Sequence, residues 1–168
     1  MNSSSQRTHI LGIDYGRVWI GLAIADEVAA LPKPLDTLER VNRNEDMRRL
    51  REIVRENGVK QIVVGLPLRL DGTRGEMAEE AQRFAERVRK QIGVPVEMVD
   101  ERLTSWEAER LLEEQSGRVM HKSAPSHVST AHLQKKKKTD GAKTVDATAA
   151  AVILKEYLAT RPTAPPSI

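Results

Sequence analysis

The stretch from Gln61 to Gly65 constrains the fold most, because it contains the uninterrupted apolar triplet Ile62-Val63-Val64. β-Branched residues without polar alternation are typical of a strand that is buried on both faces. Such a strand usually lies in a parallel sheet with helices on each side. The surrounding sequence agrees, since apolar residues recur at helical spacing before it, at 47–54, and after it, at 77–92.

Three further strands are predicted before this point. His9–Asp14 and Trp19–Ala25 are rich in apolar residues, and the polar break between them contains Gly16, which is a hairpin signal. Leu35–Arg40 is expected to form a third strand at the sheet edge, where the nearby prolines are tolerated. Trp19 is interpreted as a residue that packs on the sheet.

Helix boundaries are predicted from capping residues. Asn44 is expected to cap a helix that stops at Gly58, and Gly93 is expected to end the helix that begins near Met77. A strand should then follow at Pro95–Val99. Thr104 and Glu107 form a capping box for a third helix, which should end near Gly117. The last helix is expected from about Thr144 to Tyr157.

The order of these elements predicts an α/β fold, with an antiparallel portion first and strands alternating with helices afterwards. We therefore expect a mixed five-stranded sheet with helices on both faces. Residues 9–158 should form one domain with a mobile basic loop at about 117–143. Residues 1–8 and 159–168 are expected to be disordered, because they are polar or rich in proline.

Composition excludes several classes of site. The chain has no cysteine, which rules out disulfides, a thiol nucleophile and thiolate zinc sites. Aromatic residues make up only 3%, so stacked aromatics are a poor basis for binding nucleic acid. No apolar stretch approaches the roughly 20 residues that span a bilayer. A cytoplasmic location without membrane contact is expected, and the net charge of +3 permits a polyanionic partner.

Three acidic residues occupy positions where a carboxylate is costly unless it is paired. Asp14 ends the first apolar strand, Glu101 follows the strand at 95–99, and Asp146 shares the apolar face of the last helix. Simpler explanations stay open, since Asp146 could favour a helix N-terminus and Glu101 could pair with Arg102. If the three converge, their oxygens would suit a hard cation such as Mg²⁺.

Four sequence blocks resemble the YqgF/RuvX family, and they occur in the family's order from about His9 to Leu158. The blocks are Gly12-Ile13-Asp14-Tyr15-Gly16 with Ile20-Gly21-Leu22-Ala23, Val64-Gly65-Leu66-Pro67-Leu68 with Asp71-Gly72-Thr73, Asp100-Glu101-Arg102-Leu103-Thr104-Ser105, and Val145-Asp146-Ala147 with Ala149-Ala150 and Val152-Ile153-Leu154.

The resemblance implies an RNase H-like fold and a hydrolase of the nuclease type, related to Holliday-junction resolvases. It implies processing of the 5′ end of pre-16S rRNA in ribosome biogenesis, with Mg²⁺ or Mn²⁺ as the metal. The family's acidic triad falls on Asp14, Glu101 and Asp146, which would be both metal ligands and catalytic residues.

Substrate contacts are expected from basic and loop residues. Arg17 and Arg102 could contact phosphate, and Asp71 and Thr73 lie in a turn-rich loop that could meet the substrate. The basic run is interpreted either as a solvated loop or as a phosphate-contacting loop. It consists of Lys135, Lys136, Lys137 and Lys138.

Other functions are compatible with the same sequence features. The chain could be a non-catalytic module that binds RNA, a ribosome precursor or a transcription complex, or a resolvase that acts on branched DNA. A nucleotide-dependent phosphotransferase of the actin-like fold is disfavoured, because that architecture needs two lobes. The chain could act as a monomer or as a homodimer.

Overall fold

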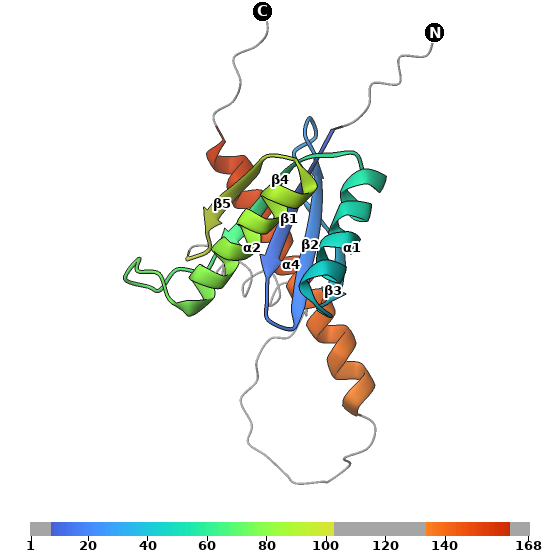
Figure 1. The fold of residues 1–168 in the computed structure, drawn as a ribbon, viewed down its shortest axis with the longest axis vertical. Helices are drawn as coiled ribbons and strands as arrows, with labels where there is room; N and C mark the ends of the chain where they lie inside the picture. The colour runs from blue at the N-terminus through green and yellow to red at the C-terminus, as the bar shows by residue number, and fades with distance from the viewer. Residues whose placement is uncertain (1–7, 103–133, 162–168) are drawn as a thin grey trace, which may run out of the picture.

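The computed structural model of the protein describes residues 8–102 and 134–161, with side chains for 8–102 and 145–161. These residues form five strands and three helices, which are arranged in layers (Figure 1). In chain order the elements are β1 (His9–Tyr15), β2 (Trp19–Asp26), β3 (Lys33–Glu39), α1 (Arg43–Glu56), β4 (Val59–Leu66), α2 (Glu76–Ile92), β5 (Val96–Asp100) and α4 (Gln134–Thr160).

The five strands form one mixed sheet in the order β3-β2-β1-β4-β5. β1 pairs antiparallel with β2, and β2 pairs antiparallel with β3, which confirms the hairpin and the edge strand. β4 pairs parallel with both β1 and β5. The interior position of β4, between two parallel neighbours, explains why its sequence lacks polar alternation.

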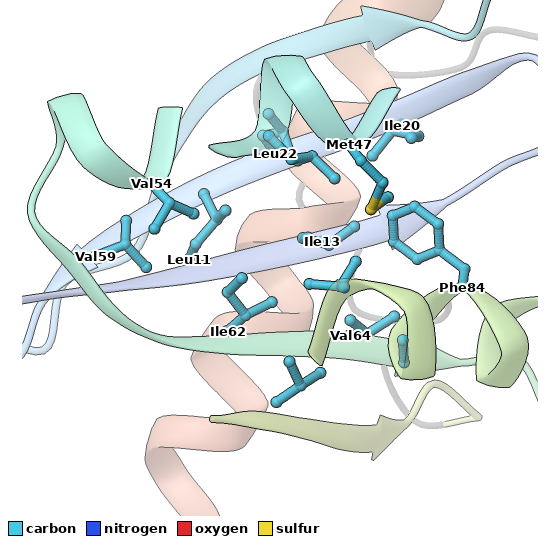
Figure 2. Packing of buried hydrophobic residues seen from close by; sticks show 14 of the residues in the cluster. Leu11, Ile13, Ile20, Leu22, Met47, Val54, Val59, Ile62, Val64 and Phe84 are labelled. Carbon is cyan, nitrogen blue, oxygen red and sulfur yellow. The ribbon is translucent and has the colours of Figure 1, made fainter. Parts of the chain in front are cut away.

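Helices cover both faces of the sheet, as predicted (Figure 1). α1 and α2 pack on one face, where Leu11, Ile13, Met47, Ile62 and Phe84 belong to the larger core cluster (Figure 2). α4 crosses the other face and forms a second cluster with the alternate residues of the same strands. Both faces of β1 and β4 are therefore buried.

Small residues allow α4 to approach the sheet closely. A Cβ added to Gly12 would lie 2.9 Å from the Ala150 carbonyl oxygen and 3.0 Å from the Leu154 Cβ. A Cβ on Gly21 would overlap the carbonyl group of Asp146. Because Gly12 and Gly21 have no Cβ, α4 can pack this closely against β1 and β2.

The predicted start of α1 was wrong by a short distance. Asn42, rather than Asn44, caps the helix, because its side-chain oxygen accepts hydrogen bonds from the backbone N–H groups of Asn44 and Glu45. An N-cap residue bonds the N–H groups two and three positions further on, which Asn42 does here. The predicted stops are confirmed, since Gly58 and Gly93 follow their helices with positive φ.

The predicted basic loop was also partly wrong, because α4 begins at Gln134 rather than near Thr144. The run Lys135–Lys138 therefore lies in the first turns of this helix. Gly141 was expected in a loop, but a single helical glycine costs only about 1 kcal/mol. Lysine is a good helix former, and the helix extends without proline to Thr160.

Several predictions fall on other parts of the chain. The capping box at Thr104 and Glu107 and the loop from Gly117 to Leu133 lie outside the described residues, as do 1–7 and 162–168. Within the described ranges, no helix is sufficiently long and apolar to span a membrane.

One buried ion pair joins the edge of the sheet to α1. Asp46 is 3% exposed and is the only charged side chain fully buried in the described part of the chain. Its carboxylate accepts hydrogen bonds from Arg40 Nε and from the Val41 backbone N–H, both at 3.1 Å. Arg40 also donates to the Tyr15 hydroxyl at 2.9 Å and to the Gly16 carbonyl. This network holds the turn that follows β1.

Asp46→Ala should lower the free energy of unfolding by about 2–3 kcal/mol, since it leaves Arg40 without its buried partner. Urea denaturation measures this loss. Glu52→Ala on the same helix is the matched control, because it removes an exposed partner of Arg48 and should cost about 0.5 kcal/mol or less. Equal losses in the two variants would contradict a structural role for the buried pair.

Candidate active site

Asp14 lies near the end of β1 and faces α4. Strand residues alternate between faces, so Ile13 enters the core beneath α1 and α2 while Asp14 shares the opposite face with Gly12. Asp14 is paired with Gly21 of β2, the glycine that packs against the backbone of Asp146. The side chain is half-buried beneath the helix.

Glu101 reaches the same face from the other side of β1. It follows β5 directly, and its backbone N–H donates to the Leu66 carbonyl at 3.1 Å, which continues the pairing with β4. A Cβ on Gly65 would overlap the Glu101 carboxylate and would lie 2.6 Å from the Ile153 Cδ1. Gly65 follows Val64, the ladder partner of Ile13, so Glu101 lies over the position beside Asp14.

Asp146 approaches from above, on α4. Its backbone rests against Gly21, and its side chain is half-buried. Asp14 therefore lies between Gly65 of β4, which Glu101 covers, and Gly21 of β2, which Asp146 covers. The structure thus brings Asp14, Glu101 and Asp146, which are distant in sequence, to one end of the sheet.

The pKa values of Asp14, Glu101 and Asp146 reflect their burial and, for Asp14 and Glu101, a neighbouring acid. Burial raises the pKa of Asp14 to about 7, and the neighbouring Asp146 carboxylate contributes to this rise. Burial also raises the pKa of Glu101 to about 8, with contributions from Asp14 and then Asp100. The pKa of Asp146 is raised by burial. Since like charges oppose ionisation, Asp14 is coupled to an acid on each side.

The donor set suits a hard cation, although it is not a closed cage. Within residues 8–102 and 134–161, no three acidic or histidine side chains are drawn together tightly enough to hold a metal ion as they stand. The acids are instead close in pairs, with Asp14 common to both pairs. Carboxylate oxygens fit Mg²⁺ or Mn²⁺, which also retain water ligands and need few protein groups.

Asp100 is the last residue of β5 and directly precedes Glu101, so strand alternation directs the two side chains to opposite faces. Its carboxylate accepts a hydrogen bond from Arg102 Nε at 2.8 Å and forms an ion pair with Arg102 Nη2 at 2.6 Å. Arg102 is exposed and lies next to the loop that follows β4, since a Cβ on Gly72 would be 3.0 Å from its Nη1. Arg102 directly follows Glu101 in the chain, and its guanidinium is held between Asp100 and the loop that contains Gly72.

The other predicted contact residues are placed as follows. Asp71 accepts hydrogen bonds from the backbone N–H and the hydroxyl of Thr73, at 2.9 and 2.6 Å, so these two residues stabilise their own turn. Arg17 forms ion pairs with Glu80 and Glu76 of α2, at 2.8 and 3.3 Å. The Arg17 side chain thus lies on the α2 side of the sheet, on the face opposite the three acids.

Two glycines that shape the site, Gly21 and Gly65, were not predicted from the sequence. Gly65 lies near the end of an apolar strand and Gly21 interrupts another, and a glycine inside a strand often marks the close approach of another group. That signal was present for both residues. Which group approaches each glycine depends on contacts with α4 and Glu101, which are remote in sequence.

Comparison with known proteins shows clear similarity to one family. Residues 8–126 match the family model described as RuvX, Holliday junction resolvase. A protein of Anaeromyxobacter sp. (strain Fw109-5) named "Putative pre-16S rRNA nuclease" is 40% identical over 148 residues, which cover 88% of this chain and 94% of that protein. A protein of the same name from Thermosynechococcus vestitus is 36% identical over 152 residues, 90% and 88% of the two chains.

The fold is similar to that of a solved resolvase. The structure described as T. thermophilus RuvC in complex with Holliday junction substrate has a TM-score of 0.52, with 17% sequence identity. The similarity covers 89% of this chain and 93% of that one. It confirms the expected RNase H-like fold with its mixed five-stranded sheet, and at this identity it shows the fold alone.

Gly65→Ala should force Glu101 and Ile153 to move and should lower the free energy of unfolding by about 1–3 kcal/mol. Gly75→Ala is the matched control, because its Cβ would meet only the flexible end of Arg69 and should cost less than about 1 kcal/mol. Urea denaturation of both variants tests the packing. A Gly65→Ala protein as stable as the parent would show that the close contact is not needed.

The raised pKa values predict how stability depends on pH in EDTA. In the folded protein Asp14 and Glu101 keep protons that the unfolded chain releases near pH 4. Above that pH, the folded state therefore binds more protons than the unfolded state. The free energy of unfolding should therefore fall as pH rises from about 5 to about 8. The double variant Asp14→Asn/Glu101→Gln should show a flatter profile, and identical profiles would contradict the assignment.

Proposed function

This chain belongs to the RuvX family, and on that premise we propose that it is a metal-dependent nuclease that processes the 5′ end of pre-16S rRNA. The observation that supports this most directly is the placement of Asp14 between Glu101 and Asp146 at one end of the sheet. The names of the full-length relatives supply the substrate, precursor 16S rRNA.

In this proposal each acid has a distinct task. Asp14 is the shared ligand, because both of the other carboxylates are close to it. Glu101 and Asp146 complete the ligand set from the end of β5 and from α4. Bound Mg²⁺ or Mn²⁺ would supply an activated water and would stabilise the leaving oxygen of the phosphodiester. A cation also offsets the cost of ionising carboxylates that burial keeps protonated.

Basic residues on the same side of the fold would hold the RNA backbone. Arg102 lies exposed beside Glu101, with Asp71 and Thr73 in the adjacent loop. The first turns of α4 project beyond the end of the sheet in Figure 1. Since a helix rises 1.5 Å per residue, Lys138 is about 12 Å along the axis from Asp146. Lys135, Lys136, Lys137 and Lys138 would thus contact phosphates that flank the cleaved bond.

A second candidate activity is cleavage of four-way DNA junctions. The family model's description names a Holliday junction resolvase, and the RuvC structure has the same fold. The same carboxylates would serve either substrate, because phosphodiester hydrolysis needs the same metal chemistry in RNA and DNA. A non-catalytic RNA-binding role would instead leave substrate intact at every metal concentration.

Asp14→Asn and Asp146→Asn should each reduce Mg²⁺-dependent cleavage of precursor 16S rRNA by about 100-fold or more, because each removes a ligand of the ion that stabilises the transition state. Asp36→Asn is the control, since Asp36 is an exposed acid on β3. Its activity should match that of the parent.

The assay should compare precursor rRNA, duplex DNA and a four-way junction with the same enzyme preparation. Cleavage of the junction alone would replace the rRNA proposal with the resolvase. Parental activity in Asp14→Asn would contradict the metal site, and binding without cleavage by the parent would favour the non-catalytic role.

A further inference from the structure

A second charged site lies on the face of the sheet opposite the three carboxylates. A cavity of about 220 Å³ opens between the start of α1, the middle of α2 and the end of β1. Four arginines line it, with one tyrosine and one glutamate among the other lining residues. These polar residues are Tyr15, Arg40, Arg43, Glu80, Arg83 and Arg87.

The charges in this cavity do not balance. Asp46 neutralises Arg40, and Arg17 forms an ion pair with Glu80 at 2.8 Å that lowers the pKa of this glutamate. Arg83 lies 3.9 Å from Glu79, and its charge contributes to lowering the pKa of Glu80. For Arg43 and Arg87, the described part of the chain provides no carboxylate within ion-pair distance. The cavity therefore has an excess of positive charge.

The geometry suits an oxyanion. Arg43 is the first residue of α1, so the positive end of the helix dipole lies at the same opening. The Arg40 guanidinium is fixed by Asp46, by the Tyr15 hydroxyl and by its position 5.0 Å over the Tyr15 ring. Arginine forks bind phosphate through paired hydrogen bonds, which a fixed and partly desolvated position strengthens.

The cavity is next to the candidate active site along the chain. Tyr15 directly follows Asp14, and the alternation of the strand sends the two side chains to opposite faces. Tyr15 packs against Phe84 of α2, with ring centroids 5.0 Å apart. A polyanion that passes over the end of β1 could thus contact the carboxylate site on one side and the arginines on the other.

We propose that Arg43 and Arg87, supported by Arg40 and Arg83, bind a backbone phosphate of the RNA substrate at the end of β1, on the face of the sheet opposite the three acids. This inference rests on the proposed nuclease function for the identity of its ligand. The interaction is with phosphate and not with a base, so it should be independent of sequence and sensitive to salt.

The test measures RNA binding without cleavage. Asp14→Asn protein is compared with Asp14→Asn protein that also carries Arg43→Gln and Arg87→Gln, by fluorescence anisotropy with a labelled single-stranded precursor rRNA fragment over a salt series. The cavity variant should bind about tenfold more weakly at low salt. Its plot of log affinity against log salt should be shallower by about 0.7 for each phosphate that the arginines no longer neutralise.

The matched control carries Arg55→Gln and Lys60→Gln in the same background. Both residues are exposed and lie near the start of β4, at the other end of the sheet, so the control removes the same charge away from the cavity. Its salt dependence should remain that of Asp14→Asn. Equal changes in the two double variants, or an unchanged slope in the cavity variant, would overturn the proposal.

A cleavage assay with the protein retaining Asp14 separates this inference from the proposed function. If that protein cleaves no RNA but the cavity variant still shows the weaker, less salt-dependent binding, the nuclease proposal fails and the phosphate site stands. If it cleaves RNA while Arg43→Gln/Arg87→Gln leaves the salt slope unchanged, the phosphate site fails alone. Urea denaturation should show both double variants to be folded, and a cavity variant that is only less stable would make these arginines structural.

Discussion

The close packing of α4 on a glycine-lined face of the sheet is the interaction on which the candidate site depends. Gly12 and Gly21 allow the helix backbone to approach within van der Waals distance of β1 and β2. A larger residue at either position would lift the helix and move Asp146 away from Asp14. With the helix at this height, the Asp146 carboxylate is near enough to Asp14 to raise the pKa of that residue.

Burial by α4 gives these carboxylates their unusual properties. Acids beneath a packed helix lose water, and proximity then makes the ionisation of one oppose that of the next. Both effects raise the pKa values of Asp14 and Glu101, to about 7 and about 8. Carboxyl groups that are costly to ionise in the folded state lower the stability of the fold at neutral pH. We therefore infer that Asp14 and Glu101 have a functional role rather than a stabilising one. A divalent cation is the partner that reverses this cost.

Sequence predicted the parts of the structure that local pattern determines. The apolar run of β4, the hairpin around Gly16 and the stops at Gly58 and Gly93 all depend on neighbouring residues, and all are confirmed. The position of Asp14 at a strand end and of Asp146 on an apolar helix face followed in the same way. That Glu101 lies over Gly65 could not follow, because strand order and the path of α4 decide it. The early start of α4 was missed because Gly141 resembles a local break.

At the end of β1, acidic residues gather on one face of the sheet and arginines on the other. Asp14 faces the acids under α4, whereas Tyr15 faces the arginines of α1 and α2. The alternation of side chains along β1 is sufficient to place the two sites on opposite faces of the sheet. The network of Arg40, Asp46 and Gly16 stabilises the turn that follows β1. A nucleic acid brings both phosphate charge and a scissile bond, so it needs cations to bind it and acids to hold a metal. Separation by the thickness of the sheet prevents the arginines from pairing with the acids, which would otherwise neutralise both sites.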